Sequence, residues 1–333
     1  MAVIGVSSTW GTELARRLER DPEIEYVAGF DSTPPAGLDR TEFIEADVRS
    51  PVLARLLPST EVDTVVHCGI LLYPEKDKPA RALHEINVIG TLQLLAACER
   101  APTLRRVVVR GSAAIYGVEP TGPAFYTEDL ARRMPLRTRF QRDVSELEQY
   151  FENFAARHPR LSCCMLRYQA EISPDLDTPL VRYLTLPVVP TQLGYDPRLQ
   201  LIHAEDATAA LEATIHSDAR GPVNVGAEGV ISLSRLLRLA RRPAAPLPHP
   251  LFAPALRRLG QALGTGPLYG DAVRLLRYGR GVDITRLRET IPFEPRYSTA
   301  EAVRDFVDKT SSRRVVPPLH LGEVAERLGA GRR

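Results

Sequence analysis

The chain has 333 residues, 44% of them hydrophobic, and a formal net charge of +2. This length can bury a large core, and it suits one large domain or a domain with a smaller partner. The near-neutral balance argues against a nucleic-acid partner and against a charged membrane surface. The sequence shows neither a signal peptide nor an apolar run of about 18 residues, so we expect a cytoplasmic protein without membrane contact.

The first apolar run meets a glycine-containing turn and then a helical pattern. A short apolar run, Val3 and Ile4, meets Gly5, and a helical pattern follows the second glycine, Gly11. Such a unit presents backbone N–H groups at a helix N-terminus, where the pyrophosphate of a dinucleotide binds. Ser8 replaces the middle glycine of the turn, and its Cβ narrows the approach to a phosphate. The cofactor-binding residues expected here are Gly5, Ser8, Thr9, Trp10 and Gly11.

Strands and helices then alternate along the chain. Further strands are predicted at 25–31, 43–48, 62–69 and from 106 to 109, with a helix at 83–97. This alternation predicts an α/β fold with a Rossmann-like, doubly wound parallel sheet. Asp31 closes the second strand, where a carboxylate would hydrogen-bond an adenosine ribose and disfavour the 2′-phosphate of NADP. The alternative is an aspartate that only starts a turn, because Ser32–Pro35 follows it.

Beyond Arg167 the chain becomes rich in proline, and helices are predicted near 204–215, 233–241, 251–263 and 299–308. We expect a dinucleotide-binding, Rossmann-like domain over residues 1–166. A smaller C-terminal substrate lobe is expected over residues 167–310, interleaved with the sheet, and residues 311–333 are interpreted as a tail. The sequence shows no internal repeat.

The order of the motifs resembles that of the extended short-chain dehydrogenases/reductases, the NAD-dependent epimerase/dehydratase family. The resemblance runs from Val3 to about Asp308. It rests on the turn Gly5–Gly11, Asp31, Asp47-Val48, His67–Gly69, Asn87–Thr91, Gly111–Gly117, Leu166-Arg167, Arg198–Asp206 and Gly221–Gly226. The run Asp196–Gln200, followed by a histidine, resembles an actinobacterial subgroup of this family.

The resemblance implies NAD as the cofactor, a small-molecule substrate and a homodimer. Besides the turn, the cofactor-binding residues that it implies are Asp31, Asp47, Val48, Cys68, Gly69 and Asn87. The substrate-binding residues that it implies are Tyr116, Arg167, Gln200 and His203. The dimer would use a helix that carries Leu147, Tyr150, Phe151 and Phe154 at helical spacing, although these side chains could equally pack inward.

The chain departs from the family at the positions that carry its chemistry. The family uses a Tyr-x-x-x-Lys pair, in which the tyrosine moves a proton and the lysine lowers its pKa. Phe140 and Val144 stand at these positions, and no lysine lies between Lys78 and Lys309. Ala170 replaces the asparagine of the family's LRxxNxxGP segment, so a nucleotide sugar loses a usual contact. We therefore expect no redox epimerisation by the standard mechanism, and an NAD site that is weakened, structural or lost.

Three residues are candidates for the proton transfer that remains. Ser112 ends a strand at the edge where doubly wound sheets bind ligands. Tyr126 lies in the following loop and either carries the proton or packs against the lobe. His67 is expected to face the cleft, as is His203, with a structural histidine as the alternative for each.

The remaining polar and aromatic residues are interpreted as structural. Asp143, Glu146 and Glu148 are expected to form a solvent-exposed helix face, and His84 is expected to be structural. Trp10 either packs the first helix on the sheet or plugs part of the pyrophosphate site. The cysteines lack metal-ligand spacing, so we expect buried thiols and no metal site: Cys68, Cys98, Cys163 and Cys164.

We therefore favour an enzyme that acts on a small metabolite by non-redox proton transfer, through isomerisation, elimination or cyclisation. One alternative is a catalytically inactive protein that senses NAD(H) or serves as a scaffold. Another is an NAD-dependent oxidoreductase or epimerase in which another group replaces the Tyr-Lys pair. A cofactor titration separates these hypotheses, because a protein that binds NAD(H) is stabilised by it.

Overall fold

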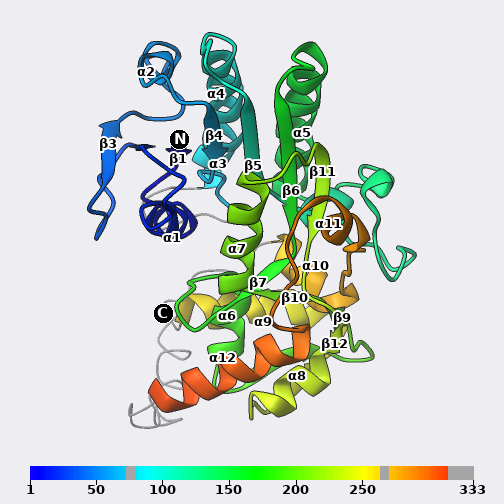
Figure 1. Cartoon of the computed structure of the whole chain (residues 1–333). Helices are drawn as coiled ribbons and strands as arrows, with labels where there is room; N and C mark the ends of the chain where they lie inside the picture. The colour runs from blue at the N-terminus through cyan, green and yellow to red at the C-terminus, as the bar shows by residue number, and fades with distance from the viewer. Residues whose placement is uncertain (73–79, 263–269, 314–333) are drawn as a thin grey trace, which may run out of the picture.

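The computed structural model of the protein describes residues 1–72, 80–262 and 270–313 (Figure 1). Its centre is a seven-stranded sheet in the order β11-β6-β5-β4-β1-β2-β3, in which all pairs are parallel. The strands are β1 (Ala2–Ile4), β2 (Val27–Asp31), β3 (Thr41–Glu45), β4 (Thr64–His67), β5 (Arg106–Ser112), β6 (Ser162–Tyr168) and β11 (Gly221–Val225). The predicted doubly wound α/β fold is confirmed.

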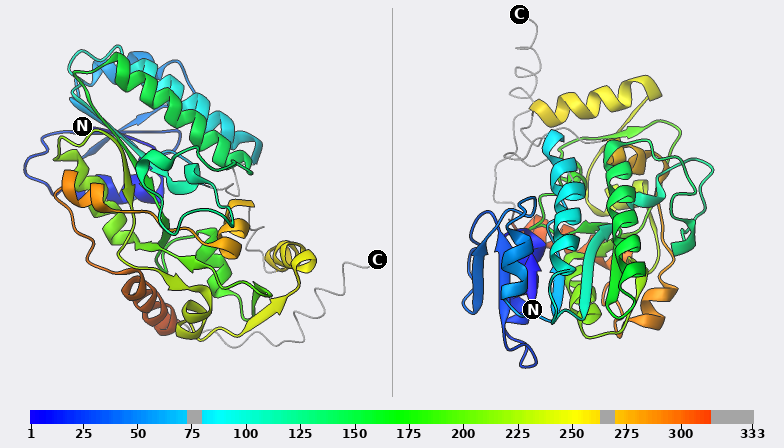
Figure 2. Two further views of the ribbon diagram at one scale, coloured as in Figure 1. Left: turned by 90° about the vertical axis from the view of Figure 1, so that its right-hand side faces the viewer. Right: turned by 90° about the horizontal axis from the view of Figure 1, so that it is seen from above.

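Helices cover both faces of the sheet, because successive apolar residues of each strand point to opposite faces. Val3 and Val66 pack on one face with α1 (Thr9–Leu18), α7 (Ala204–Ile215) and α11 (Thr285–Thr290). Ile4 and Val65 pack on the other face with α2 (Leu53–Ser59), α4 (Gly90–Cys98) and α5 (Arg139–Arg157). Figure 2 shows α4 and α5 side by side on that face. A short helix α3 (Ala80–His84) leads through a π-helical turn (Glu85–Ile89) into α4.

The second half of the chain builds a smaller lobe below the carboxyl ends of the strands (Figure 1). Its strands pair in twos: β7 (Ala170–Ile172) with β10 (Leu201–His203), β9 (Arg198–Leu199) with β12 (Ile231–Ser232), and β8 (Val189–Gln192) with β13 (Ala244–Leu247). Its helices are α6 (Pro179–Thr185), α8 (Leu233–Leu239), α9 (His249–Ala262), α10 (Gly270–Tyr278) and α12 (Thr299–Arg313). β11 and α7 come from this half of the chain but complete the sheet domain.

Two expected boundaries fall near the edge of the described residues. The helix predicted at 251–263 corresponds to α9, and α12 continues to Arg313, into the segment expected to be a tail. The rest of that segment, 314–333, lies outside the described residues. Across the described part of the chain, no helix combines the length and the apolar character that crossing a bilayer requires.

Helix α5 begins at a capping box and packs most of one face into the core. Thr138 caps it by accepting from the Gln141 backbone N–H, and the Gln141 side chain accepts from the Thr138 N–H in return. Leu147, Phe151 and Phe154 pack into the core, and Tyr150 is half-buried against the same cluster, so this row largely faces inward. The homodimer stays a prediction.

The expectation of an exposed acidic face on α5 is wrong for two of its three members. Asp143 is 4% exposed and Glu148 is 1% exposed, whereas buried acids normally need a partner. Asp143 pairs with His84, and Glu148 pairs with Arg167. Because each partner lies on a distant segment of the chain, spacing along α5 alone could not indicate burial.

Candidate active site

A cavity of about 250 Å³ lies where the carboxyl ends of β5 and β6 meet the first turn of α5 and the lobe helices α6 and α10. This edge of a doubly wound sheet is the usual place of ligand binding. Most of its lining is apolar, including Trp10, Leu72, Leu83, Phe140, Leu180 and Leu275. The polar side chains in its lining include two arginines and three acids: Ser112, Thr138, Arg139, Asp143, Gln169, Glu171, Thr178, Asp271 and Arg280. An apolar pocket with convergent polar groups is typical of a small-molecule site.

The two positions of the family's Tyr-Lys pair carry no proton-transfer group. Phe140 lines the cavity, and Val144, one turn further along α5, is 1% exposed and packs in the core. The loss of the Tyr-Lys pair that the sequence indicated therefore holds in the structure as well. In the described residues, the only lysine is Lys309, whose Nζ lies 2.9 Å from Asp305 on α12.

Asp143 places a carboxylate in this cavity, whereas the sequence predicted that this side chain faces solvent. It lies three residues after Phe140, so both side chains share one face of α5. Asp143 Oδ1 is 2.9 Å from His84 Nδ1, and the His84 side chain is 33% exposed. A carboxylate that accepts from Nδ1–H fixes the imidazole tautomer and leaves Nε2 free to exchange protons. His84 thus has an ionisable partner, Asp143. The sequence predicted a structural histidine and indicated no such partner.

Ser112 lines the cavity. It ends β5 opposite Tyr168 of β6 and is 7% exposed. Its Oγ accepts from the Ala114 N–H at 3.2 Å, which leaves the hydroxyl hydrogen free to point elsewhere. Ser112 is therefore able to donate a hydrogen bond to an oxygen atom of a bound molecule.

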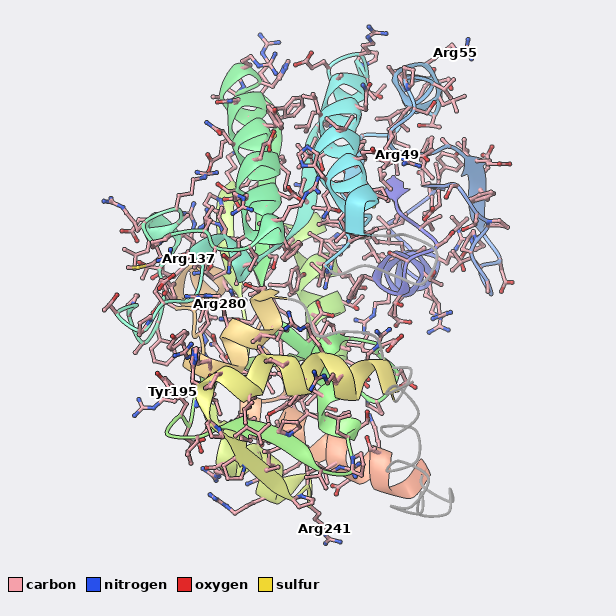
Figure 3. All side chains as sticks on the ribbon, turned by 180° about the vertical axis from the view of Figure 1, so that it is seen from behind. Arg49, Arg55, Arg137, Tyr195, Arg241 and Arg280 are labelled. Carbon is pink, nitrogen blue, oxygen red and sulfur yellow. The ribbon has the colours of Figure 1, made fainter. Side chains whose placement is uncertain are left out.

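Arg280 brings a buried positive charge to the cavity. It is 6% exposed and lies just after helix α10 (Figure 3). Its Nη1 has no hydrogen-bond partner among the described residues, and Asp271 Oδ1 lies 3.9 Å away. That Asp271 oxygen already accepts from Gln141 Nε2 at 2.6 Å. Because a buried unpaired donor is costly, this guanidinium favours an anionic group in the cavity.

His67 does not face the cavity, so its expected catalytic role is corrected. Its ring is fully buried, and Nε2 lies 3.2 Å from the Thr91 hydroxyl. Burial lowers the pKa of His67 to about 4, which keeps the ring neutral near physiological pH. Neighbouring Cys68 is also buried, and burial raises the pKa of its thiol to about 12.

Tyr126 is also placed away from Ser112. Its backbone N–H donates to Gly281 O at 3.0 Å, and it bridges to Val282 in parallel fashion. These bonds draw the loop toward the segment after α10, where the Tyr126 ring stacks on Tyr116 with centroids 5.1 Å apart. Tyr126 is 2% exposed, and burial raises its pKa. It lines a second cavity, and the expected proton-carrier role is replaced by packing.

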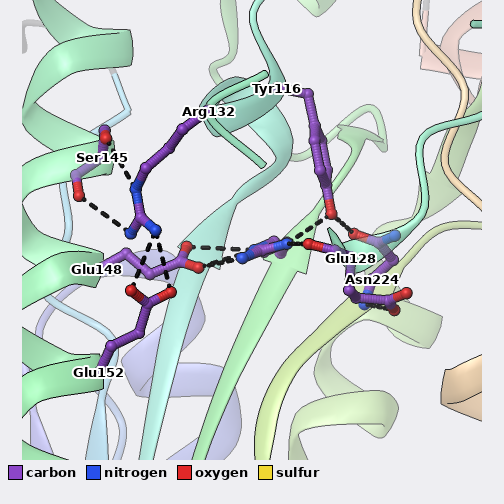
Figure 4. A network of polar contacts seen from close by, with 8 residues as sticks. Tyr116, Glu128, Arg132, Ser145, Glu148, Glu152 and Asn224 are labelled. Carbon is purple, nitrogen blue, oxygen red and sulfur yellow. Dashed lines mark hydrogen bonds and ion pairs between the residues drawn. The ribbon is translucent and has the colours of Figure 1, made fainter. Parts of the chain in front are cut away.

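Two predicted substrate residues, Tyr116 and Arg167, belong to a buried polar network instead (Figure 4). Arg167 Nε donates to Glu148 Oε1 at 3.0 Å, and Nη1 donates to the Tyr116 hydroxyl at 2.8 Å. The Tyr116 hydroxyl donates to Asn224 Oδ1 at 2.5 Å. The network joins α5, β6 and β11, so both residues stabilise the fold and neither borders the cavity.

The other two predicted substrate residues are satisfied inside the lobe. Gln200 Nε2 donates to Ala227 O at 2.8 Å, and its Oε1 accepts from Val282 N at 2.6 Å. His203 Nε2 lies 3.1 Å from Asp305 Oδ2, and its ring stacks on Tyr297. Both side chains are nearly fully buried, and neither lines the Ser112 cavity.

The glycine turn keeps two of its structural functions. Gly5 has φ +81°, and a Cβ on it would lie 2.4 Å from Gly69 Cα; a Cβ on Gly11 would lie 2.1 Å from Gly5 O. These glycines therefore allow the tight turn and the close packing of α1 on the sheet. Ser8 Oγ accepts from the Gly11 N–H at 3.0 Å and donates to Gly5 O at 2.7 Å. The Ser8 side chain thus takes up the Gly11 N–H, which would otherwise be able to donate a hydrogen bond to a phosphate. Thr9 is exposed.

The residues predicted for the adenosine half lie at the carboxyl end of the strands with partners of their own. Asp31 accepts from the backbone N–H groups of Ser7 at 3.0 Å and Ser32 at 2.7 Å. Asp47 is paired with Arg49, and Val48 packs against Gly90. Both amide atoms of Asn87 bond the Leu71 backbone at 2.8 Å, so Asn87 fixes the loop after β4.

The Trp10 side chain is half-buried and lines the cavity. Its indole N–H donates to Glu171 of β7, and the Arg110 guanidinium lies 3.8 Å over its ring. Arg110 of β5 is ion-paired with Glu171, and both side chains are at most 3% exposed. The nicotinamide half of a dinucleotide would run from α1 across the ends of these strands. The residues present therefore do not fit that half of NAD.

Several of these groups escaped sequence reasoning. Asp143 had one usable signal, its place on the same helix face as Phe140. Arg110, Glu171 and Arg280 carried none, because their meaning depends on contacts between segments more than 60 residues apart, such as that of Arg280 Nε with Gln169 Oε1. Among the residues that the structure covers, no three His, Cys, Asp or Glu side chains gather as a metal site would require.

Comparison with known proteins places this site in context. Residues 1–226 match the family model described as the NAD dependent epimerase/dehydratase family. The chain belongs to this family. Membership confirms the resemblance seen in the motifs, and the family binds NAD. The atypical subgroup stays a prediction.

Relatives at the sequence level include mycobacterial proteins. The uncharacterized protein Rv0501 of Mycobacterium tuberculosis is 38% identical over 310 residues, which cover 91% of this chain and 82% of the relative. The uncharacterized protein Rv2047c of the same organism is 26% identical over 313 residues, which cover 92% of this chain and 29% of that protein.

Solved structures share the fold. MoeE5 in complex with UDP-glucuronic acid and NAD has a TM-score of 0.69 and 22% identity, covering 93% of this chain and 98% of that chain. UDP-glucuronic acid 4-epimerase from Bacillus cereus, in complex with NAD, has a TM-score of 0.68 and 18% identity with the same coverage. At these identities the likeness extends to the fold alone.

Proposed function

We propose that this family member is an enzyme that moves a proton on a small anionic metabolite, without net oxidation or reduction. The observation that carries the proposal is the pairing of Asp143 with His84 at 2.9 Å, in a cavity that Ser112 also lines. The cavity volume of about 250 Å³ suits a compact metabolite, since pockets for drug-sized ligands span roughly 300–1,000 Å³.

Each polar group has a separate role in this proposal. Asp143 accepts a proton from the substrate, as a carboxylate in an apolar pocket can do. Ser112 donates a hydrogen bond to the substrate oxygen on which negative charge develops. Arg280 holds a carboxylate or phosphate of the substrate through its unpartnered Nη1.

His84 connects this chemistry to solvent. Its Nδ1–H supports the Asp143 carboxylate, and its one-third exposure provides a route by which a proton reaches water. The proton that Asp143 accepts returns to another atom of the same substrate in an isomerisation or cyclisation. In an elimination it leaves with the departing group. All three reactions balance without a hydride acceptor.

The family's NAD does not enter this reaction. MoeE5 was solved with UDP-glucuronic acid and NAD, and the Bacillus cereus epimerase with NAD. Here the Ser8 side chain takes up the Gly11 N–H of the turn, and Trp10 stands where the nicotinamide half would run. Ala170 and Phe140 further remove the polar side chains that the family motif supplies. These features favour proton transfer over the redox alternative and over a sensor that needs the whole dinucleotide.

Deuterium exchange tests the proposal even while the product is unidentified. A panel of small hydroxy- and keto-carboxylates and their phosphate esters is incubated with the protein in D₂O, and mass spectrometry detects deuterium at carbon. We expect incorporation into at least one compound with the wild type and a loss of about 100-fold or more in Asp143→Asn. Asp218→Asn is the matched control, because the Asp218 side chain is 100% exposed. Exchange that persists in Asp143→Asn would refute the assigned role.

A further inference from the structure

Trp10 lies on the path that links the first turn of α1 to the Ser112 cavity. It belongs to the first turn of α1, yet its side chain lines the cavity together with Ser112 and Phe140. In a doubly wound sheet, a dinucleotide places its pyrophosphate at this helix terminus and its second nucleotide over the neighbouring strands. The indole therefore fills space that the nicotinamide riboside would cross.

Two contacts hold the indole in this position. Its N–H donates to the Glu171 carboxylate, and its face receives the Arg110 guanidinium at 3.8 Å. The same Arg110 is 4.8 Å from the ring centroid of Tyr168 and is ion-paired with Glu171. A buried cation stacked on a tryptophan is among the stronger non-covalent contacts of an aromatic ring. Moving the indole aside would break this contact and remove a hydrogen bond from a buried carboxylate.

We propose that the stack of Trp10, Arg110 and Glu171 closes the nicotinamide half of the dinucleotide site. The stack forms a wall between the α1 turn and the Ser112 cavity, so a nicotinamide ring gains no contact beside Ser112. Adding the nicotinamide ring to ADP-ribose should then contribute nothing to affinity. This inference does not rest on the proposed function, because it concerns binding of the dinucleotide in the absence of any substrate.

The test compares ADP-ribose with NADH on the full chain. Calorimetry measures both affinities, and the fluorescence of the reduced nicotinamide reports whether the ring enters a shielded site. For the wild type we expect affinities within about threefold of each other, or no binding of either ligand, and no fluorescence gain. An NADH affinity at least tenfold above that of ADP-ribose, with enhanced fluorescence, would overturn the proposal.

Variants decide whether Trp10 is the cause. Trp10→Ala should raise NADH affinity at least tenfold and produce the fluorescence gain, and Trp10→Leu provides the same test if the alanine variant does not fold. Phe140→Ala is the matched control, because it removes an aromatic ring from the same cavity without clearing the path from α1. If neither folded Trp10 variant gains NADH affinity, or if Phe140→Ala gains as much, the stack is not what closes the site.

Trp10 is also its own probe, because the chain contains one tryptophan. Its emission therefore reports directly on the stack, and Glu171→Gln should shift the emission maximum, because it replaces the carboxylate that accepts from the indole N–H. Saturating NADH should leave the wild-type emission maximum unchanged. A shift on adding NADH would mean that the dinucleotide displaces the indole and would contradict the closed site.

Discussion

Glu148 of α5 and Arg167 of β6 form an ion pair in which each side chain is only 1% exposed. Glu148→Gln removes the carboxylate and leaves a buried guanidinium without its counter-charge. We expect a loss of about 3–5 kcal/mol in the free energy of unfolding, measured by urea denaturation. Glu152→Gln is the control, because Glu152 is 41% exposed and its pairing with Arg132 is worth at most about 1 kcal/mol. Equal losses in the two variants would contradict a structural role for the buried pair.

The buried ring of His67 should make stability depend on pH. Its pKa is lowered from 6.5 to about 4 in the folded protein, so the unfolded chain binds the proton more readily between these values. The stability that His67 contributes is therefore present above about pH 6.5 and is lost as the pH falls toward about 4, by up to roughly 3 kcal/mol. His67→Gln should lose less stability than the wild type between about pH 7 and about pH 5. Parallel urea-denaturation curves for the two proteins would refute this assignment.

Ser112→Ala separates chemistry from folding. We expect the exchange rate of the reactive compound to fall by about 100-fold, because the hydroxyl stabilises charge only as it develops. Thermal stability should hardly change, since Ser112 Oγ has one hydrogen bond, from Ala114 N. Ser145→Ala is a suitable comparison, because that hydroxyl contacts Arg132 on the outer side of α5. Unchanged exchange in Ser112→Ala would remove Ser112 from the mechanism.

Arg280→Met should affect binding and stability in opposite directions. The affinity of the anionic substrate should fall at least tenfold, because Nη1 has no other hydrogen-bond partner in the described chain. The melting temperature should stay level or rise, because methionine relieves a buried charge with incomplete partners. Arg274→Met is the contrast: its guanidinium bonds Val118 O at 2.6 Å, so we expect lost stability with substrate affinity retained. Calorimetry with the compound found by deuterium exchange measures both affinities.

The sheet was predictable because its signals are local. Continuous apolar strands and the alternation of strands with helices each depend on neighbouring residues. The loss of the Tyr-Lys pair was equally readable, since it needs only the identities of Phe140 and Val144. Ser112 followed from its place at a strand end, which topology directs to the ligand-binding edge.

The polar contacts of the site were not predictable in the same way. Tyr116, Gln200 and His203 have residue types that suit a substrate site, but their partners come from distant segments and satisfy them inside the fold. Asp143 and Glu148 show the reverse error, because charged residues on a helix are usually exposed. Pairing across 59 and 19 residues decides their burial, and no local pattern encodes it.

The place of β11 has a consequence for how the protein is made. This strand pairs with the edge of β6, and α7 packs on one face of β6. Both elements lie far beyond β6 in the chain. While residues up to 168 have left the ribosome and Gly221–Val225 has not, β6 presents an open edge and an uncovered apolar face. The nascent sheet must therefore wait for part of the lobe before it closes, which makes the interval between these segments the period of greatest exposure to aggregation and chaperone binding.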